Sequence, residues 1–597
     1  MAFEKKLSNL LGKQEVNNAF ITQALKESNV TTSGNDAKKY STSGDDFVDN
    51  FAAISQFKSP RSYQEVSKDM ALLWSQNPTL CLKLAVYIRL ITRKSKVVTE
   101  ESAEVLEVQR GQGLKNEGIM RMLWLAINQP KTFKANFSYF IAAGSWKDVF
   151  QMLSLDLQYH GWDGRKLDWN FFYLAIGAGI TNPETTHLVR KYLPTIRTNK
   201  NCKTIEAQAD TLVGRWLARK FSPDLEKETA YKAYRKMKSE GVAHQWQQLI
   251  SKQLYDKINF DRIAGRALAL LVGSKFLENH NLTKKYSEWI QSKPVAKFTG
   301  FVFELLAPLD ERRNLEEYKK ATINAQFAQL VETGRGGENT NSSLLVVRDT
   351  SGSMTATANG CNVSSFNIAK SMALYFSEFL TGTFAGTFAE FSHGCKLHKW
   401  KGDTPVDKYL NDHCGSYADT NFQSVIDMFI KIKEEGVPEE DFPSGILCIS
   451  DGEFNRCGTN KLTNFQLAIK KLRDAGFSEN YVSNFKIVLW DIPNSYYGRT
   501  SGVHFEDFAD APNFFYLAGY DPSVIAFLLG NGKVDRTPRN AKELFLAAMD
   551  QELLNRLVVL KKTIRKNATI PIIILYDFLF SKVNINVAIT IGIKAPV

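Results

Sequence analysis

The sequence predicts an α-helical first half followed by a doubly wound α/β domain. Helical periodicity runs through residues 47–332 almost without interruption. A short segment rich in Gly, Asn and Ser follows at residues 333–343 and is predicted to be a linker. Beyond it, apolar strand-like segments alternate with helix-like segments, which is the pattern of a parallel sheet covered by helices.

The composition is that of a folded protein with several domains. Its 597 residues exceed what one hydrophobic core normally serves, so we expect two to four domains. The content of 44% hydrophobic and 23% charged residues excludes a mainly disordered or fibrous chain. Seventy-five basic residues against 63 acidic ones give a net charge of +12, which is compatible with an anionic partner.

The cysteines and the apolar segments indicate the compartment. Seven scattered cysteines without paired short spacing are typical of reduced thiols, so we expect a cytoplasmic protein, or a virion-associated one if the gene is viral. The N-terminus has no secretory signal, and no apolar stretch reaches the ~20 residues that cross a bilayer. We therefore expect a soluble protein without a membrane partner.

The first half begins with a segment predicted to be flexible. Residues 27–46 are rich in Ser, Thr, Gly, Asn and Asp, and we expect residues 1–46 to form a flexible leader. In the region that follows, helices of ten to fifteen residues joined by short polar turns predict stacked helix pairs of the solenoid type. No fixed repeat period is found. Because strand alternation is lacking there, we expect no β-structure before residue 330.

The α/β domain is predicted over residues 344–556. Its first strand, at residues 344–347, is apolar throughout and is expected to be fully buried. The apolar, β-branched residues 557–597 are either a strand pair that returns to one of the domains or an unusual tail. Further strands are predicted at residues 385–391, 445–450, 485–490 and 513–517, and helices at residues 366–380, 422–434, 464–474 and 522–529.

Oxygen ligands occur on three separate loops of the predicted α/β domain. Asp349, Ser351 and Ser353 form a D-x-S-x-S motif after the first strand, Thr420 precedes a helix, and Asp451 follows the strand at 446–450. Ligands bind at the carboxyl ends of strands in open α/β sheets. Carboxylates and hydroxyls suit Mg²⁺ or Ca²⁺ and not zinc. For D-x-S-x-S alone, a strand–turn–helix with a capping serine is the alternative.

These residues resemble the metal-ion-dependent adhesion site of von Willebrand factor A domains, over roughly residues 342–530. The family's Asp and two Ser of D-x-S-x-S, the Thr of its second loop and the Asp of its third fall on Asp349, Ser351, Ser353, Thr420 and Asp451. The resemblance implies one divalent cation, Mg²⁺ first and Ca²⁺ or Mn²⁺ as alternatives. It also implies an open coordination position that an acidic residue of a protein partner fills.

The helical half carries a second resemblance, to a poorly characterised family of plants, fungi, bacteria and viruses that joins a helical domain to a C-terminal von Willebrand A domain. A related architecture is that of the Ro autoantigen, whose TROVE module is a ring of HEAT-like helices. The resemblance implies a HEAT-like ring or horseshoe over residues 47–332 that binds small noncoding or single-stranded RNA. The family's usual Met after Ser-Asp is Gly452 here. The residues that carry the resemblance are Trp124-Leu125, Pro130, Asn136, 144–148, Tyr234-Arg235, Trp246, 298–305, 420–423 and 449–454.

A basic segment with interleaved aromatic residues supports RNA binding by the helical half. Residues 190–239 hold thirteen basic and five acidic residues, with Tyr192, Trp216, Tyr231 and Tyr234 between them. Cations that neutralise phosphates beside rings that stack on bases are what single-stranded RNA binding needs. The alternative is a solvated helix face with aromatic residues in the core. The candidate RNA-binding residues are Arg190, Lys191, Arg197, Lys200, Lys203, Arg215, Trp216, Arg219, Lys220, Arg235 and Lys236, with a second cluster at Lys83, Arg89 and Arg93.

Enzyme motifs are lacking, and we predict no catalytic residues. The phosphate-binding loop, the G-x-S-x-G nucleophile elbow and the H-E-x-x-H zinc motif are not found. His393, His398 and His413 lie near Cys395 and Cys414, but their spacing matches no zinc site, so we expect surface or core histidines.

The leading hypothesis is a non-enzymatic RNA-binding subunit of a ribonucleoprotein, with a metal-dependent docking domain. One alternative is a protein–protein scaffold, or a structural component of a virion or its assembly, which uses the metal site for adhesion-type binding without nucleic acid. A further alternative is a divalent-ion phosphodiesterase that uses Asp349 and Asp451, although it would have no general base nearby in the sequence.

Overall fold

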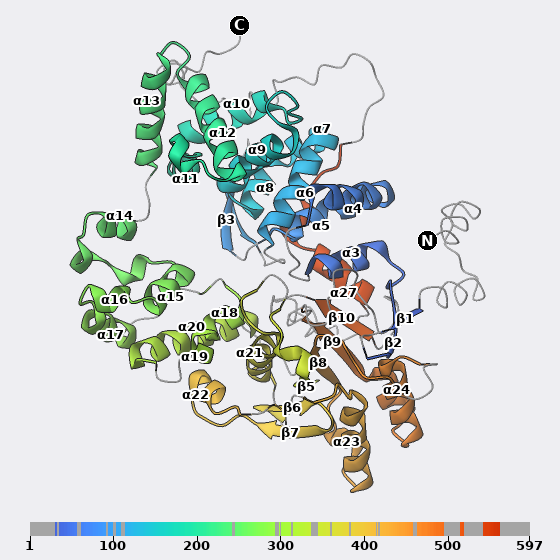
Figure 1. The fold of residues 1–597 in the computed structure, drawn as a ribbon. Coiled ribbons are helices and arrows are strands. Elements are labelled where there is room, and N and C mark those ends of the chain that lie inside the picture. Colours follow the sequence, from blue (N-terminus) through green and yellow to red (C-terminus); the bar gives the residue numbers. More distant parts are fainter. Residues whose placement is uncertain are drawn as a thin grey trace, which may run out of the picture. The chain divides into compact units, whose positions relative to one another are not determined.

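The computed structural model describes most of the chain between residues 30 and 560, and it shows helices together with one larger sheet (Figure 1). The chain folds into two compact units, the first from Met1–Ser59, Ala264–Leu277 and Thr283–Ala548, and the second from Pro60–Ile263, Glu278–Leu282 and Met549–Val597. The described residues are 30–32, 35–55, 61–90, 93–98, 103–108, 114–241, 245–292, 298, 300–311, 315–335, 344–358, 361–380, 384–413, 415, 418–457, 462–492, 494, 514–518 and 541–560.

The second unit is built mainly from helices that pack against one another. Side-chain caps set the starts of several of them. In the first helix the Ser62 hydroxyl accepts from Glu65 N, while the Glu65 carboxylate accepts from Ser62 N. The Asn77 and Thr204 side chains cap two later helices. The helices are α4 (Tyr63–Gln76), α5 (Pro78–Tyr87), α6 (Lys115–Asn128), α7 (Pro130–Ala135), α8 (Phe137–Ala143), α9 (Trp146–His160), α10 (Trp169–Thr181), α11 (Thr186–Tyr192), α12 (Ile205–Phe221), α13 (Lys227–Glu240), α14 (Gln245–Ser251) and α28 (Glu552–Asn555).

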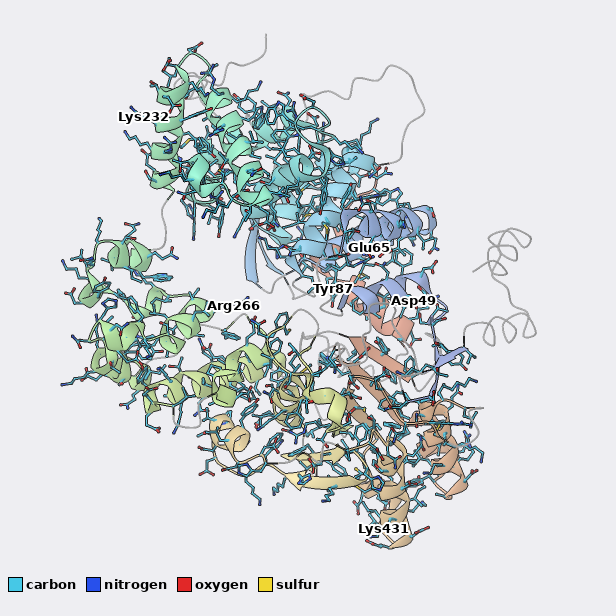
Figure 2. All side chains as sticks on the ribbon, viewed as in Figure 1. Asp49, Glu65, Tyr87, Lys232, Arg266 and Lys431 are labelled. Atoms are coloured by element: carbon cyan, nitrogen blue, oxygen red, sulfur yellow. The ribbon has the colours of Figure 1, made fainter. Side chains whose placement is uncertain are left out.

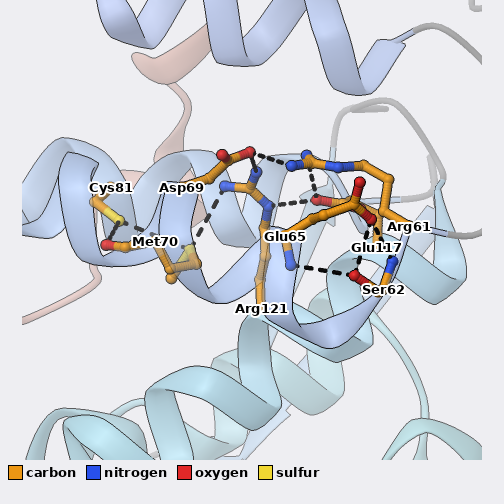
Figure 3. A network of polar contacts seen from close by, with 8 residues as sticks. All are labelled: Arg61, Ser62, Glu65, Asp69, Met70, Cys81, Glu117 and Arg121. Carbon is orange, nitrogen blue, oxygen red and sulfur yellow. Dashed lines mark hydrogen bonds and ion pairs between the residues drawn. The ribbon is translucent and has the colours of Figure 1, made fainter. Parts of the chain in front are cut away.

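A buried network of charges joins α4 to α6 in this unit (Figure 3). The Arg121 side chain is fully buried, and its Nε donates to Glu117 Oε1 over 3.1 Å. Arg61 pairs with Asp69 at 2.5 Å and with Glu117 at 3.4 Å. Two arginines and two carboxylates thus balance each other's charge, which is what makes burial of Arg121 tolerable.

Two β-hairpins precede residue 330, where we expected no β-structure. β1 (Val30–Thr32) pairs antiparallel with β2 (Lys38–Tyr40), and β3 (Arg93–Val98) pairs antiparallel with β4 (Ala103–Val108). The predictions of an all-helical region and of a flexible leader are therefore wrong at these segments. Strands of three to six residues are too short for their alternation to stand out in a sequence. The coarser prediction, a helical region followed by a mixed α/β sheet domain, is confirmed.

The segment predicted to be a flexible leader is packed in the first unit from residue 35 onward. Ala37 and Tyr40 are buried, and the hairpin is followed by helix α3 (Asp46–Ser55). Phe47 and Phe51 of α3 pack their rings against Phe545 of α27 (Ala541–Met549). This apolar contact ties the N-terminal segment to the end of the α/β region.

The sheet of the first unit has six strands in the order β10-β9-β8-β5-β6-β7. Neighbouring strands are parallel except β6 and β7, which are antiparallel. Sequence analysis located β6, β8, β9 and β10 to within two residues and missed only β7, an edge strand that carries mainly polar and charged side chains. The strands are β5 (Leu344–Asp349), β6 (Thr387–Phe391), β7 (Cys395–Lys399), β8 (Gly445–Ser450), β9 (Lys486–Asp491) and β10 (Phe514–Ala518).

The predicted helices at 366–380, 422–434 and 464–474 correspond to α21 (Ser365–Ser377), α23 (Gln423–Glu434) and α24 (Asn464–Asp474), whereas the one at 522–529 lies outside the described residues. The two compact units do not follow the predicted boundary at residues 333–343. Helices before that boundary belong to the unit of the sheet, where Tyr409 OH donates to Asp310 Oδ1 over 2.8 Å. The remaining helices of this unit are α15 (Gly265–Gly273), α17 (Thr283–Ser292), α18 (Val302–Leu306), α19 (Pro308–Glu311), α20 (Glu317–Arg335), α21 (Ser365–Ser377), α22 (Pro405–Leu410), α23 (Gln423–Glu434), α24 (Asn464–Asp474) and α25 (Glu479–Asn484), and α16 (Phe276–Asn279) spans both units.

The start of the predicted apolar tail lies in the helical unit. The Asn136 side chain donates to Val558 O over 2.7 Å and accepts from Val558 N over 2.9 Å, so residues 557–560 run beside α7 and α8. Residues 561–597 of the predicted tail lie outside the described residues. Among the helices that the structure describes, none is both long and apolar enough to cross a bilayer.

Candidate functional site

The first loop of the candidate metal site is held by bonds to the end of β5. Asp349 ends this strand and is fully buried. Its Oδ1 accepts from Ser351 N over 2.8 Å, and the hydroxyls of Ser351 and Ser353 lie 3.2 Å apart. Thr350 N donates to Phe391 O of β6 over 2.9 Å. The D-x-S-x-S motif therefore brings one carboxylate and two hydroxyls together in a fixed turn.

Backbone hydrogen bonds join the first loop to the second and the second loop to the third. Gly352 N donates to Ala418 O over 3.2 Å, and Asn455 N donates to Thr420 O over 2.9 Å. Thr420 and Asp451 are each 2% exposed. Pairing of β5 with β8 brings the ends of these two strands, and so Asp349 and Asp451, to the same edge of the sheet.

The two carboxylates of the site influence each other. Burial, together with the negative charge of Asp451, raises the pKa of the Asp349 carboxyl to about 7. Asp349 Oδ2 accepts from Ser450 Oγ over 2.5 Å. Asn494 Nδ2 donates to Asp451 Oδ2 and to Ser353 O, each over 3.0 Å. Two carboxylates are thus kept at one place, and hydrogen bonds from Ser450 and Asn494 offset part of their repulsion.

Sequence analysis missed Ser450 and Asn494 as parts of this site. Ser450 had a signal, because it stands directly before Asp451 at the end of a predicted strand. Asn494 had none, since it follows β9 outside any motif and reaches the site only through the fold. Both side chains orient carboxylates that the motif identified, as the second layer of a metal site does.

The donor set fits a hard divalent cation. Asp349 and Asp451 supply carboxylate oxygens, and Ser351, Ser353 and Thr420 supply hydroxyls, which Mg²⁺, Ca²⁺ or Mn²⁺ prefer. A cation beside the two buried carboxylates would also neutralise their repulsion. No group of three or more His, Cys, Asp and Glu side chains in the described part of the chain could hold a metal ion. The five candidate metal ligands do not form such a group, because only Asp349 and Asp451 among them are carboxylates.

The N-terminal hairpin packs on the third loop of the site. Asn35 Nδ2 donates to Glu453 O over 2.7 Å, Arg456 N donates to Asn35 O over 3.0 Å, and the ammonium of Lys39 donates to Gly452 O. Lys39 is only 2% exposed. Gly452 has a φ of 71°, a left-handed conformation that favours glycine over the Met common in the resembling family.

The candidate RNA-binding residues divide into exposed and internal ones. Lys200, Lys203, Arg219, Lys220, Arg235 and Lys236 are exposed, whereas Lys191, Arg215 and Trp216 are half-buried. Arg190 pairs with Glu240 at 2.8 Å and Arg197 with Asp210 at 3.4 Å. The exposed cations lie on α12, on α13 and in the segment before α12, at one end of the helical unit, where Figure 2 labels Lys232 of α13.

Several residues of the predicted RNA surface are internal instead. Arg89 is 4% exposed and pairs with buried Asp148 at 2.8 Å, so its assignment to the RNA surface is wrong. Tyr231 and Tyr234 are buried, as the alternative of core aromatic residues predicted. Lys83 donates to Asn555 Oδ1 over 2.5 Å.

The remaining candidates are Arg93 and the predicted cluster of His and Cys residues. The side chain of Arg93, in β3, lies outside the described residues, as does Cys414. The exposed His393 lies 3.2 Å from Asp419 and the half-buried His398 lies 3.1 Å from Glu390.

Comparisons with known proteins give one family match and one structural similarity. No curated protein matches the chain. The structure is similar to the crystal structure of the Deinococcus radiodurans RO (RSR) protein, with 11% sequence identity and a TM-score of 0.39, over 84% of this chain and 99% of that chain. The model of a domain of unknown function, DUF7788, matches residues 343–571. That match contains all six strands of the sheet and all five candidate metal ligands, and it is this family that the α/β region resembles.

Proposed function

We propose that the protein is a non-enzymatic RNA-binding subunit of a ribonucleoprotein. In this proposal the helices of the second unit stack as HEAT-like pairs and bind small or single-stranded RNA. The α/β region is a von Willebrand A-type domain that docks an acidic protein partner through a divalent cation, Mg²⁺ in the first place.

The observation that carries the RNA half is a set of exposed cations without counterions. Lys200, Lys203, Lys220, Lys232 and Lys236 are exposed and make no ion pair with any other residue that the structure describes. Like charges held on neighbouring helices repel one another, and a polyanion would relieve that repulsion. Binding of a nucleic acid backbone releases its counterions and is therefore favourable at low salt.

The metal half is supported by the three joined loops. From β5 the chain continues to β6 on one side of the sheet, and from β8 it continues to β9 on the other side. The loops after β5 and β8 therefore lie at the switch point of the sheet, where open α/β sheets bind their ligands. Asp349, Ser351, Ser353, Thr420 and Asp451 would hold the cation, and an acidic group of the partner would complete its coordination. The cation supplies positive charge for docking, while the buried carboxylates fix its position.

A gel-shift series tests the RNA half. Single-stranded and hairpin RNA are titrated with the protein at rising salt, and we expect binding that weakens steeply with salt. Absence of salt-sensitive binding at micromolar protein would overturn this half of the proposal. The same samples, incubated with Mg²⁺ or with EDTA, report any cleavage of the RNA and so test the phosphodiesterase alternative.

A protein–protein scaffold is the second candidate function, and the buried three-loop site supports it. Two variants distinguish the scaffold from the RNA-binding function. Asp349→Ala should abolish capture of a protein partner and leave RNA binding unchanged. Reversal of the charges of Arg219 and Lys220, which are exposed, should have the opposite effect. If only Asp349→Ala has a consequence, the scaffold function is the correct one.

A further inference from the structure

The loop between α9 and α10 is held in one shape by a buried carboxylate. Asp156 is fully buried, and its Oδ2 accepts from Trp169 Nε1 over 2.8 Å and from Leu167 N over 3.2 Å. Its Oδ1 accepts from Lys166 N over 3.0 Å. Asp168 then caps α10 by accepting from Phe171 N. A loop fixed by this many bonds presents its side chains with little loss of conformational entropy on binding.

Four aromatic rings of this loop, α10 and α12 are in contact one after the other, and we name them the aromatic ladder. Trp162 contacts Trp169 with ring centroids 5.6 Å apart, and Trp169 contacts Trp216 at 4.8 Å. Trp216 in turn contacts Tyr173 at 6.3 Å. Trp169 is largely buried, whereas Trp162 is 38% exposed. The inner rings therefore anchor the ladder, and Trp162 presents indole surface to solvent.

Two cations lie on the rings of the ladder. The guanidinium of Arg165 lies 4.0 Å from the ring centroid of Trp162 and 5.3 Å from that of Trp169. The Lys220 ammonium lies 6.0 Å from the Tyr173 ring. Arg165 Nη1 is buried and has no hydrogen-bond partner among the described residues. Arg165 makes no ion pair with a carboxylate of the described residues, so its charge is available to attract an anion.

We propose that the aromatic ladder is the base-binding part of the RNA surface, an inference that rests on the proposed RNA-binding function. A base of single-stranded RNA stacks on the exposed indole of Trp162, and the flanking phosphates pair with Arg165 and Lys220. Flat rings beside cations match unstacked bases joined by phosphates. Duplex RNA keeps its bases stacked inside the helix and offers only phosphates to this surface, so the ladder selects single strands.

The ladder explains how the exposed cations of α12 gain selectivity. Arg219 and Lys220 end α12, one turn beyond Trp216, and lie on the exposed side of that helix. Cations alone attract any polyanion, whereas stacking requires accessible base faces. The cations therefore supply attraction and the ladder supplies discrimination between single and double strands.

The test compares a single-stranded oligouridylate with an abasic strand of the same length and charge. Binding is measured by fluorescence anisotropy at several salt concentrations. In the wild-type protein we expect the oligouridylate to bind roughly 10- to 100-fold more tightly than the abasic strand, because each stacked base contributes that much. Trp162→Ala should remove this difference and leave the salt dependence unchanged, and Trp162→Phe should restore most of it.

Two further variants control for folding and for charge. Arg165→Gln should lower the salt slope by about 0.7, the value of one phosphate contact on a single strand. Trp289→Ala removes a half-buried indole from the other unit and should change neither quantity. Circular dichroism and thermal unfolding establish that each variant is folded.

The outcomes separate the ladder from the proposed function. If the wild-type protein binds neither strand, the RNA-binding function itself fails. If it binds both strands equally, or if Trp162→Ala keeps the preference for bases, the ladder is not the base-binding site. Binding of a polyglutamate peptide is measured in the same way. If the wild-type protein binds this peptide and both Trp162→Ala and Arg165→Gln lose that binding, the ligand of the ladder is an acidic peptide and not RNA.

Discussion

Removal of three cations from α13 should weaken RNA binding by an amount that the structure allows us to work out. Lys232, Arg235 and Lys236 are exposed and occupy one face of the helix, at i, i+3 and i+4. Each phosphate that a cation neutralises on a single strand contributes about 0.7 to the slope of log K against log salt. The triple alanine variant should therefore lower the slope by about 2.

This change of slope corresponds to a large change of affinity at moderate salt. Relative to 1 M salt, where counterion release contributes little, the variant should bind single-stranded RNA about 100-fold more weakly at 0.1 M and about 30-fold more weakly at 0.2 M. Fluorescence anisotropy titrations over that range give the slope directly. Alanine is the strongest helix former, so α13 should remain folded.

A matched variant separates local contacts from net charge. Lys396, Lys399 and Lys401 are exposed in the α/β region, and their replacement by alanine removes the same three charges. We expect its slope to stay within about 0.5 of the wild-type value, since screening confines each cation to its own neighbourhood. Equal effects of the two triple variants would refute a binding surface on α13.

Three further outcomes follow from the metal site and from the buried charges. Mg²⁺ at a hundredfold excess over its Kd should stabilise the protein by about 2.7 kcal/mol in thermal unfolding, and Asp451→Asn should abolish that shift; a shift that persists would place the cation elsewhere. Arg121→Met should cost about 3–5 kcal/mol in urea unfolding because buried Glu117 loses its fully buried cation and keeps the longer pair with Arg61, and addition of Glu117→Leu should recover most of the loss. Lys39→Met should cost about 1–3 kcal/mol by the same assay because Gly452 O loses a buried donor, and an unchanged midpoint would show that the N-terminal hairpin does not hold the third loop.

Much of the α/β region could be predicted from sequence because its signals are local. The run at 344–347, which begins β5, is apolar without interruption, and such a run is typical of a strand that is buried on both faces. The motif with Asp349, Ser351 and Ser353 lies within five residues, so one turn brings its oxygens together. Strand order then carries Asp451 to the same edge, and the rule for parallel sheets was sufficient to expect it.

The basic surface was predicted less well, because charge alone does not report burial. Arg89 and Arg219 look alike in sequence, yet the first is buried against Asp148 and the second is exposed near the end of α12. Which cation meets a carboxylate depends on the packing of helices that lie far apart in the chain. Trp162 and Arg165 carried no signal, since they belong to no motif and lie outside the basic segment.

The sequence by itself determined the helical character of the first half, most strands of the sheet and the turn of the D-x-S-x-S motif, since each depends on neighbouring residues. Only the tertiary structure decided that the N-terminal hairpin belongs to the α/β unit, where Lys39 meets Gly452 across more than four hundred residues. It alone also decided that Asn494 orients Asp451 and that Arg165 lies over the rings of Trp162 and Trp169. Such contacts arise from burial and shape, which the order of residues along the chain does not display.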